Sequence, residues 1–272
     1  MPLAFHRSLC HRPAWHGPAR HRGGTALGRV LLLWATLLLP AFAGNFVVAP
    51  VNLELGSAAR SSAVTVNNLD GQPLRLQVRL VAWDQDAQGE SRHTPSDDLL
   101  YFPRLLTIPP GESRMVRVGL ARPVEAVERS YRLFLDELDT PGGDEAATGK
   151  SQVLVRVSFG IPLFVSPPRA QARVGMEVLP PAQGLLRWRL VNEGTRHARL
   201  ESFTLVALTP QGEPRGSQTV DLRYLLAGKT LEMALEAPPV ACEPGMRIEA
   251  QLRIAEAGVV RQAWRADQLP CP

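Results

Sequence analysis

The chain has 272 residues, of which 45% are hydrophobic and 21% are charged. This composition is typical of a globular protein and excludes a disordered or collagen-like chain. The formal charge of +4 at first suggests nucleic-acid binding, but residues 1–43 hold five arginines and no acidic residue, which leaves 25 basic and 26 acidic residues elsewhere. The composition therefore predicts no nucleic-acid partner.

Residues 1–43 have the features of a secretory signal peptide. Their arginines precede the apolar run Val30–Leu39, and Ala41-Phe42-Ala43 places small residues where signal peptidase requires them. A membrane anchor is the alternative, but about ten apolar residues are too few for the roughly twenty that span a bilayer. We therefore expect cleavage after Ala43 and export without stable membrane insertion.

The first part of the mature chain is rich in predicted strands. They combine β-branched and aromatic residues with an apolar–polar alternation, and turn signals such as Asp70-Gly71 and Pro109-Pro110-Gly111 separate them. The predicted strands are Phe46–Leu55, Ser62–Val66, Leu74–Trp83, Leu105–Ile108, Met115–Leu120, Tyr131–Leu138 and Ser151–Val165. Their number and spacing predict an immunoglobulin-like β-sandwich over residues 44–166.

Ser166-Pro167-Pro168-Arg169 is the expected linker, because consecutive prolines stiffen the chain and cannot donate to a β-ladder. A second set of strands is predicted at Leu185–Val191, Ala198–Leu208, Thr219–Leu222, Thr230–Leu235, Arg247–Ile254 and Val259–Trp264. We expect a second, smaller β-sandwich over residues 167–272. The predicted fold class is therefore all-β, with helix limited to one turn at Pro123–Arg129.

The mature chain keeps two cysteines, Cys242 and Cys271. In an oxidising compartment such a pair is typical of one disulfide, here one that ties the C-terminal strands together. A metal pair is the alternative, but the remaining histidines, His93 and His197, are far from the cysteines in sequence. The sequence thus predicts a Cys242–Cys271 disulfide and no metal.

The chain contains none of the common motifs of hydrolases, metalloproteases or nucleotide-binding enzymes. Asp84-x-Asp86-x-Gln88-Gly89 resembles the start of a calcium loop, but Pro95 stands where that loop requires a bidentate glutamate. A solvated hairpin is the favoured interpretation. The carboxylates of Asp136-Glu137 are likewise interpreted as exposed or salt-bridged residues, and we expect no enzymatic activity.

Ser151–Val165 is the most informative segment. Val153, Val155, Val157, Phe159 and Ile161 alternate with other residues and therefore fall on one face of a strand. One interpretation is an ordinary core strand. The other is a strand near a sheet edge that offers its apolar row to a partner lacking a strand. The residues alone leave both interpretations open.

The order of these elements resembles the PapD-like periplasmic pilus chaperones. The similar segments are FVVAPVNLEL from Phe46, VTVNN from Val64, IPPGESRMVRV from Ile108, YRLFLDEL from Tyr131 and VSFGIPLFVSP from Val157. They cover most of residues 46–168. Their spelling is closest to the archaic branch, which assembles spore-coat-U-like pilins. The C-terminal part resembles the family only in size, β-content and predicted disulfide.

The resemblance implies two immunoglobulin-like domains in an L or boomerang arrangement and a chaperone that acts on pilin subunits in the periplasm. Its last N-terminal strand would complete a pilin that lacks its final strand, until an outer-membrane usher accepts the subunit. The donor residues would be Val153, Val155, Val157 and Phe159, preceded by a loop at Thr140–Lys150 that orders on binding. No cofactor is implied, and self-capping by dimerisation is left open.

The alternative hypothesis is an exported structural or adhesive two-domain β-protein without chaperone activity. Its long alternating strand would then be ordinary core, and an inward charge in that strand would unfold the domain.

Two features depart from the family. Its two cations that anchor the subunit's C-terminal carboxylate correspond to Asn52 and Pro162 here. Asn52 retains hydrogen-bond donors, whereas proline has none. The sequence-near candidates for the anchoring charge are Arg156, Arg169, Arg79 and Lys150. An arginine of the family's interdomain ion cluster corresponds to Ser166, while its acidic partner corresponds to Glu128, so we expect the hinge to be held differently.

Overall fold

The computed structural model describes residues 46–138, 156–255 and 257–265. The predicted signal peptide and the predicted loop Thr140–Lys150 lie outside these ranges. The described residues form strands β1–β18 and one short 3-10 helix, η1 (Pro239–Cys242), which confirms the all-β prediction.

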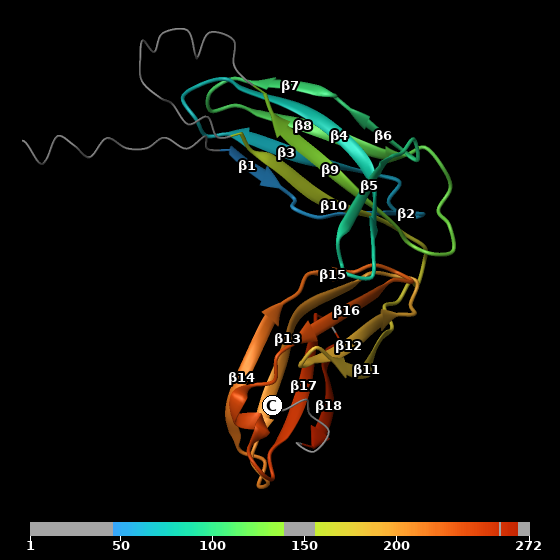
Figure 1. Cartoon of the computed structure of the whole chain (residues 1–272). Coiled ribbons are helices and arrows are strands. Elements are labelled where there is room, and N and C mark those ends of the chain that lie inside the picture. Colours follow the sequence, from blue (N-terminus) through green and yellow to red (C-terminus); the bar gives the residue numbers. More distant parts are fainter. Residues whose placement is uncertain (1–45, 139–155, 256, 266–272) are drawn as a thin grey trace, which may run out of the picture. The chain divides into compact units, whose positions relative to one another are not determined.

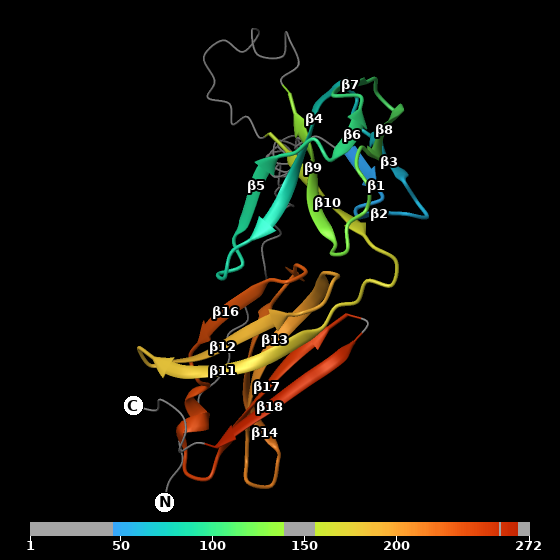
Figure 2. The ribbon, with the colours of Figure 1, turned by 90° about the vertical axis from the view of Figure 1, so that its right-hand side faces the viewer.

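Strands β1–β10 form two sheets that face each other across a common core (Figures 1 and 2). One sheet has the order β1-β3-β8-β6, and the other has the order β2-β10-β9-β4-β5 with β7 also paired to β4. The bounds are β1 (Phe46–Ala49), β2 (Leu53–Gly56), β3 (Ser61–Asn68), β4 (Leu74–Gln85), β5 (Ser91–Pro95), β6 (Leu99–Phe102), β7 (Leu105–Ile108), β8 (Ser113–Leu120), β9 (Arg129–Glu137) and β10 (Ser158–Ser166). We call this unit the N-terminal sandwich.

Alternation along the strands builds the core of the N-terminal sandwich. In β9, Tyr131, Leu133 and Leu135 are buried while the residues between them are partly exposed. In β10, Ile161 and Leu163 are fully buried. Each large aliphatic side chain removed from water in this way contributes about 1.5–3 kcal/mol. The buried side chains of β9 and β10 therefore hold both strands against the core.

Strands β11–β18 form a second pair of sheets, the C-terminal sandwich. The sheet orders are β11-β12-β16 and β14-β13-β17-β18, with β15 also paired to β13. Trp188 and Phe203 pack at its centre with their ring centroids 5.0 Å apart. The bounds are β11 (Val174–Ala182), β12 (Leu185–Asn192), β13 (Ala198–Leu208), β14 (Pro214–Asp221), β15 (Tyr224–Leu225), β16 (Thr230–Leu235), β17 (Arg247–Ile254) and β18 (Gly258–Arg265).

Each sandwich contains one buried asparagine at the end of a strand. Asn68 donates from Nδ2 to the Ile108 carbonyl at 2.9 Å and accepts from the Asp70 backbone N–H at 3.0 Å. Asn192 donates to the Leu225 carbonyl at 3.1 Å and accepts from the Gly194 backbone N–H at 3.0 Å. Both side chains thus replace backbone partners where a strand turns.

Two of the differences from the sequence predictions lie in the N-terminal sandwich. The predicted strand Phe46–Leu55 is divided at Pro50, which has no N–H, and β1 and β2 belong to different sheets. The helical turn predicted at Pro123–Arg129 is wrong. Its backbone is used elsewhere, because Glu128 N–H donates to the Thr195 carbonyl at 3.0 Å and Arg129 already pairs with Val165 in the sheet.

Candidate functional site

The two halves of β10 have different neighbours. On one side, β10 pairs with β9 over the whole length from Ser158 to Val165. On the other side, its pairing with β2 covers only Leu163 to Ser166. Within the described ranges no strand pairs with Ser158–Pro162 on the side away from β9. This part of β10 is an open sheet edge on which no strand takes the outward backbone groups, although the Gly160 carbonyl accepts from Arg132.

Two of the four predicted donor residues, Val157 and Phe159, lie at the start of β10 on its core-facing side. Val153 and Val155 lie outside the described residues. Val157 is half-buried, Phe159 packs against the N-terminal core, and Ile161 is fully buried. The Val157 carbonyl accepts from the Glu137 backbone N–H at 2.9 Å, so pairing with the neighbouring strand extends beyond the formal start of β10.

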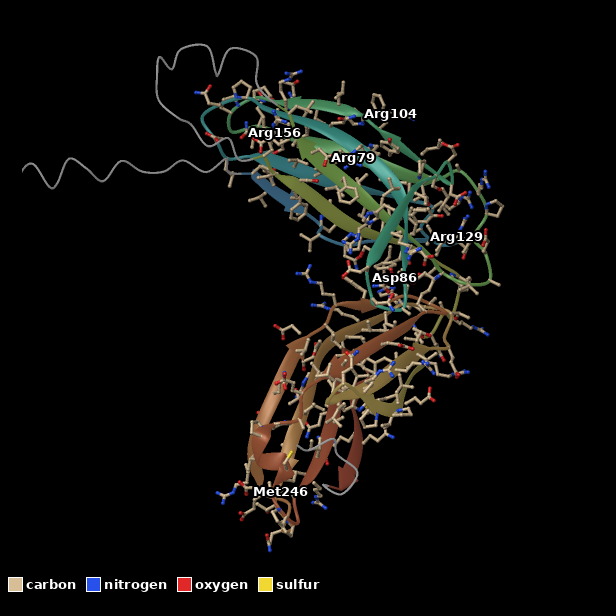
Figure 3. All side chains as sticks on the ribbon, in the orientation of Figure 1. Arg79, Asp86, Arg104, Arg129, Arg156 and Met246 are labelled. Atoms are coloured by element: carbon tan, nitrogen blue, oxygen red, sulfur yellow. The ribbon has the colours of Figure 1, made fainter. Side chains whose placement is uncertain are left out.

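A polar clamp fixes the start of β10 to the sheet. Ser158 Oγ donates to Asp136 Oδ1 at 2.5 Å, and Arg79 Nε of β4 donates to Asp136 Oδ2 at 2.5 Å. Figure 3 marks Arg79 on the N-terminal sandwich. Burial alone would raise the pKa of Asp136, but the hydrogen bonds from Arg79 and Ser158 outweigh it and lower the pKa. The charged form of Asp136 is therefore the one that holds β10.

Asn52 and Pro162, which the resemblance matched to the family's anchoring cations, lie near a different cation, Arg132. Pro162 of β10 lies directly opposite Arg132 of β9. Asn52 directly precedes Leu53, which pairs with Leu163, so Asn52 stands at the level of Pro162 on the other side. Directly opposed strand residues point to the same face, so Pro162 and Arg132 share one. Asn52 lies at the bend just before β2, and we call the three residues a row.

Arg132 is a half-buried cation. Its guanidinium stacks over the Trp83 ring at 3.9 Å from the centroid and donates to the Gly160 carbonyl at 3.4 Å. Among the residues that the structure describes, it forms no ion pair. Burial lowers the pKa of Arg132, and the nearby charge of Arg223 adds to this effect. A cation in this setting is suited to an anionic ligand.

Arg132 lines a cavity of about 350 Å³ together with Trp83, Gln85, Arg223 and Tyr224. The cavity combines aromatic surface with two cations and is open to solvent. The sequence analysis missed Arg132, although YRLFLDEL from Tyr131 contained a usable signal, namely an arginine at an outward position of a central strand.

The cations predicted from the sequence are placed elsewhere. Arg156 and Arg169 are both exposed and lie beyond opposite ends of β10, and Figure 3 labels Arg156. Asn52 is exposed and lines a cavity of about 500 Å³ together with Arg196 and Arg199. Arg196 is engaged by Glu54 at 2.8 Å. Arg79 is paired with Asp136, and Lys150 lies outside the described residues. The described candidates therefore do not form one group.

The far end of β10 meets the C-terminal sandwich at a buried carboxylate. Glu128 Oε1 accepts from the His197 backbone N–H at 2.9 Å and lies 2.8 Å from His197 Nδ1, while Ser166 Oγ donates to Oε2 at 2.6 Å. Burial would raise the pKa of Glu128, but these hydrogen bonds lower it below its ordinary value. The His197 ring also stacks on Phe164 with a centroid distance of 3.6 Å. Ser166 and Glu128, the positions that the resemblance assigned to an interdomain ion pair, are joined here by a hydrogen bond, and His197 is a partner that the sequence did not predict.

Cys242 is disulfide-bonded, whereas Cys271 lies outside the described residues, so their pairing stays a prediction. The described ranges hold no cluster of three His, Cys, Asp or Glu side chains arranged to bind a metal ion. They also hold no helix with the length and hydropathy needed to cross a membrane.

Comparison with known proteins gives one family match. Residues 45–171 match the model of the pili and flagellar-assembly chaperone, PapD N-terminal domain. No curated protein sequence matches the chain.

Solved structures share the fold of about four fifths of the chain. The CsuC–CsuE chaperone–tip adhesion subunit pre-assembly complex, from archaic chaperone-usher Csu pili of Acinetobacter baumannii, is similar at a TM-score of 0.56 and 19% identity, covering 81% of this chain and 97% of that chain. The E. coli chaperone DraB is similar at a TM-score of 0.50 and 17% identity, with coverages of 82% and 96%. The Salmonella enterica SafA pilin in complex with the SafB chaperone gives 0.50 and 13%, with coverages of 83% and 98%.

The family match covers the segment that carries β1 to β10 and the start of the following linker. It agrees with the resemblance inferred from the order of the predicted strands, and the solved structures agree with the fold of two β-sandwiches. Residues 45–171 of this chain therefore belong to the PapD N-terminal domain family of pili and flagellar-assembly chaperones.

Proposed function

We propose that this protein is a periplasmic chaperone that holds pilin subunits by donating β10 and passes them to an outer-membrane usher. The observation that carries the proposal is the open edge of β10 at Ser158–Pro162, in a chain of this family. The CsuC–CsuE and SafA–SafB structures are complexes of a chaperone with a subunit or pilin, which supports the same class of partner here. The signal-peptide features of residues 1–43 support the periplasmic location.

Strand donation would supply both affinity and shape complementarity. Unused N–H and C=O groups of β10 would pair with an edge strand of the subunit, while the row from Val153 to Phe159 would fill the subunit's apolar groove. Ile161 is buried in the chaperone's own core, so the row passes from core to donated surface near Phe159. The energy comes from association alone, and the proposal includes no enzymatic step and no cofactor.

We further propose that Arg132 anchors the subunit's C-terminal carboxylate. A subunit strand paired to β10 beyond Pro162 would meet β2, which occupies that edge from Leu53 onward. A carboxylate ending there would lie at the level of the row Asn52, Pro162, Arg132. Arg132 supplies the charge and Asn52 supplies an amide donor. Arg156 and Arg169, beyond the two ends of β10, are less well placed for this role.

Co-purification tests strand donation. The tagged protein is expressed in the periplasm with a spore-coat-U-type pilin, beside Val155→Glu, Val157→Glu and the control Gln218→Glu, an exposed residue of β14. We expect the wild type and the control to retain the pilin, and both valine variants to fold and lose it. Failure of the folded wild type to retain the pilin, together with unfolding of the valine variants, would favour the structural or adhesive alternative. Sizing the subunit-free samples tests the self-capping dimer.

A peptide pair tests the anchor. Peptides of the pilin's final strand with a free carboxylate or a C-terminal amide are titrated into the wild type, Arg132→Met and Arg156→Met. We expect Arg132→Met to lose about 10- to 100-fold in affinity for the carboxylate peptide, as for one lost charge-assisted hydrogen bond. The amide peptide should lose much less. An equal loss for both peptides, or a larger effect of Arg156→Met, would reject Arg132 as the anchor.

A further inference from the structure

The hairpin between β4 and β5 reaches beyond the N-terminal sandwich and is internally rigid. Gly89 N–H donates to the Asp86 carbonyl at 3.0 Å, and Asp86 Oδ1 accepts from the backbone N–H groups of Gln88 at 3.1 Å and Glu90 at 3.0 Å. Arg92 holds the other carboxylate oxygen of Asp86 at 3.2 Å. Figure 3 marks Asp86 at this turn. The carboxylate that resembled a calcium ligand in the sequence thus organises a hairpin.

One side chain of this hairpin forms a two-pronged contact with the C-terminal sandwich. Gln85 Nε2 donates to the Tyr224 carbonyl at 3.0 Å, and Gln85 Oε1 accepts from the Leu226 backbone N–H at 3.0 Å. The Gln85 amide therefore pairs with one backbone C=O and one backbone N–H at β15, as the backbone of a neighbouring strand would. A primary amide is the side-chain group that can donate and accept in this paired manner.

Further contacts surround Gln85. The Ala87 carbonyl accepts from the Glu232 backbone N–H at 2.7 Å, and Asp84 pairs with Lys229 at 2.6 Å. Gly89 has φ +80°, and an added Cβ would lie 2.8 Å from Leu231 Cδ1. A side chain at Gly89 would press against Leu231, so the hairpin and β16 touch closely.

Gln85 also lies next to the proposed anchor. Two residues before it, Trp83 carries the stacked Arg132 guanidinium and packs against Tyr224 with a centroid distance of 5.7 Å. Arg223 precedes Tyr224 and lines the same cavity as Arg132. The cavity is therefore composite: Arg132 and Trp83 come from one sandwich, and Arg223 and Tyr224 come from the other. The hydrogen bonds of Gln85 join these two halves.

We propose that Gln85 is a positioning residue of the subunit-binding cavity. By fixing β15 to the end of β4, it brings Arg223 and Tyr224 to the Trp83–Arg132 pair, so that an anionic group meets two cations in place of one. The inference rests on the proposed function, because it assigns Gln85 an effect on a ligand that Arg132 binds. Gln85 acts through this arrangement of the two sandwiches and needs no contact with the subunit.

A double-mutant cycle tests the proposal. The affinity of a spore-coat-U-type pilin is measured for the wild type, Gln85→Leu, Arg132→Met and the double variant, with Gln218→Leu as the matched control. We expect Gln85→Leu to weaken binding by about tenfold, the equivalent of two modest hydrogen bonds. In the Arg132→Met background the same change should have little further effect, since interacting residues are non-additive.

Equal loss in both backgrounds would show a general loss of structure and would overturn the positioning role. Unchanged affinity of a folded Gln85→Leu variant would overturn it as well. Melting curves of all variants establish which of them are folded at the temperature of the binding measurement.

A second measurement separates this inference from the proposed function. Spin labels on cysteines substituted at the exposed residues Arg104 and Arg215 report the distance between the two sandwiches by pulsed electron resonance. We expect a narrow distribution in the wild type and the control, and a broadened one in Gln85→Leu. If the wild type binds no pilin, the proposed function fails, and the distance distributions alone decide whether Gln85 positions the sandwiches: broadening supports that role and an unchanged distribution overturns it.

Discussion

The two halves of β10 share one core-facing apolar row but occupy different environments. From Ile161 to Val165 every side chain is buried, and from Leu163 onward the strand has a neighbour on each side. From Ser158 to Gly160 only β9 is present, and the side chains are exposed or half-buried. The comparison teaches that one strand serves as core at one end and as an available edge at the other. The row Phe159, Ile161, Leu163 and Val165 runs through both halves, while Pro162 and Phe164 bury the other face of the second half as well.

The largest expected effect is in the buried half. Leu163 is fully buried between β9 and β2, so Leu163→Ala should lower the free energy of unfolding by about 2–5 kcal/mol. Denaturant unfolding measures this change. A loss below about 1 kcal/mol would contradict the assignment of this half to the core.

The hinge end of β10 should come next. The Glu128 side chain is fully buried and receives hydrogen bonds from His197 and Ser166. Glu128→Ala leaves those donors without a partner, and each buried orphan costs about 1–3 kcal/mol. We expect a loss of about 2–4 kcal/mol in denaturant unfolding, against almost none for the exposed control Glu213→Ala. Equal effects of the two variants would show that the carboxylate does not hold the hinge.

The open half should tolerate truncation better. Phe159 is only half-buried, so Phe159→Ala should cost about 1–2 kcal/mol, below the cost for a fully buried phenylalanine. The variant should lose most of its bound pilin while it keeps most of its free energy of unfolding. Co-purification and denaturant unfolding on the same samples measure the two losses. If the variant is strongly destabilised and its folded fraction still binds pilin as the wild type does, the distinction between the two halves fails.

The smallest effect concerns pH. The folded-state pKa of Asp136 is lowered, so its charged form adds stability above the ordinary aspartate pKa, and this contribution disappears as the pH falls through the folded value. The pairs with Arg79 and Ser158 are partly exposed, and such surface pairs contribute at most about 1 kcal/mol. Asp136→Asn should therefore slightly reduce the fall in the free energy of unfolding at acid pH. An unchanged profile would show that the clamp does not act through charge.

Much of the fold follows from local sequence. Strands with strong alternation, such as β13, β16 and β17, have the bounds predicted for them. β5 was not predicted because all five of its residues are exposed and carry no apolar period. Its pairing with β4 depends on the Asp86 turn, whose hydrogen bonds are formed only in the folded hairpin.

The site was less predictable than the fold. The apolar row of Val157, Phe159 and Ile161 is visible in one segment because a strand repeats every two residues. Arg132 was missed because its proximity to Pro162 depends on the register of β9 and β10. His197 meets Glu128 across 69 residues of sequence. Local patterns contain no information about such pairings.

Hydrogen exchange of the β10 peptides tests the central claim most directly. Amide exchange is followed over residues 156–162 and, as an internal reference, over residues 163–166, with and without a bound spore-coat-U-type pilin. The account predicts that the pilin strongly slows exchange in the first segment and leaves the already protected second segment almost unchanged. A stable complex in which residues 156–162 exchange as fast as in the free protein would contradict donation of β10.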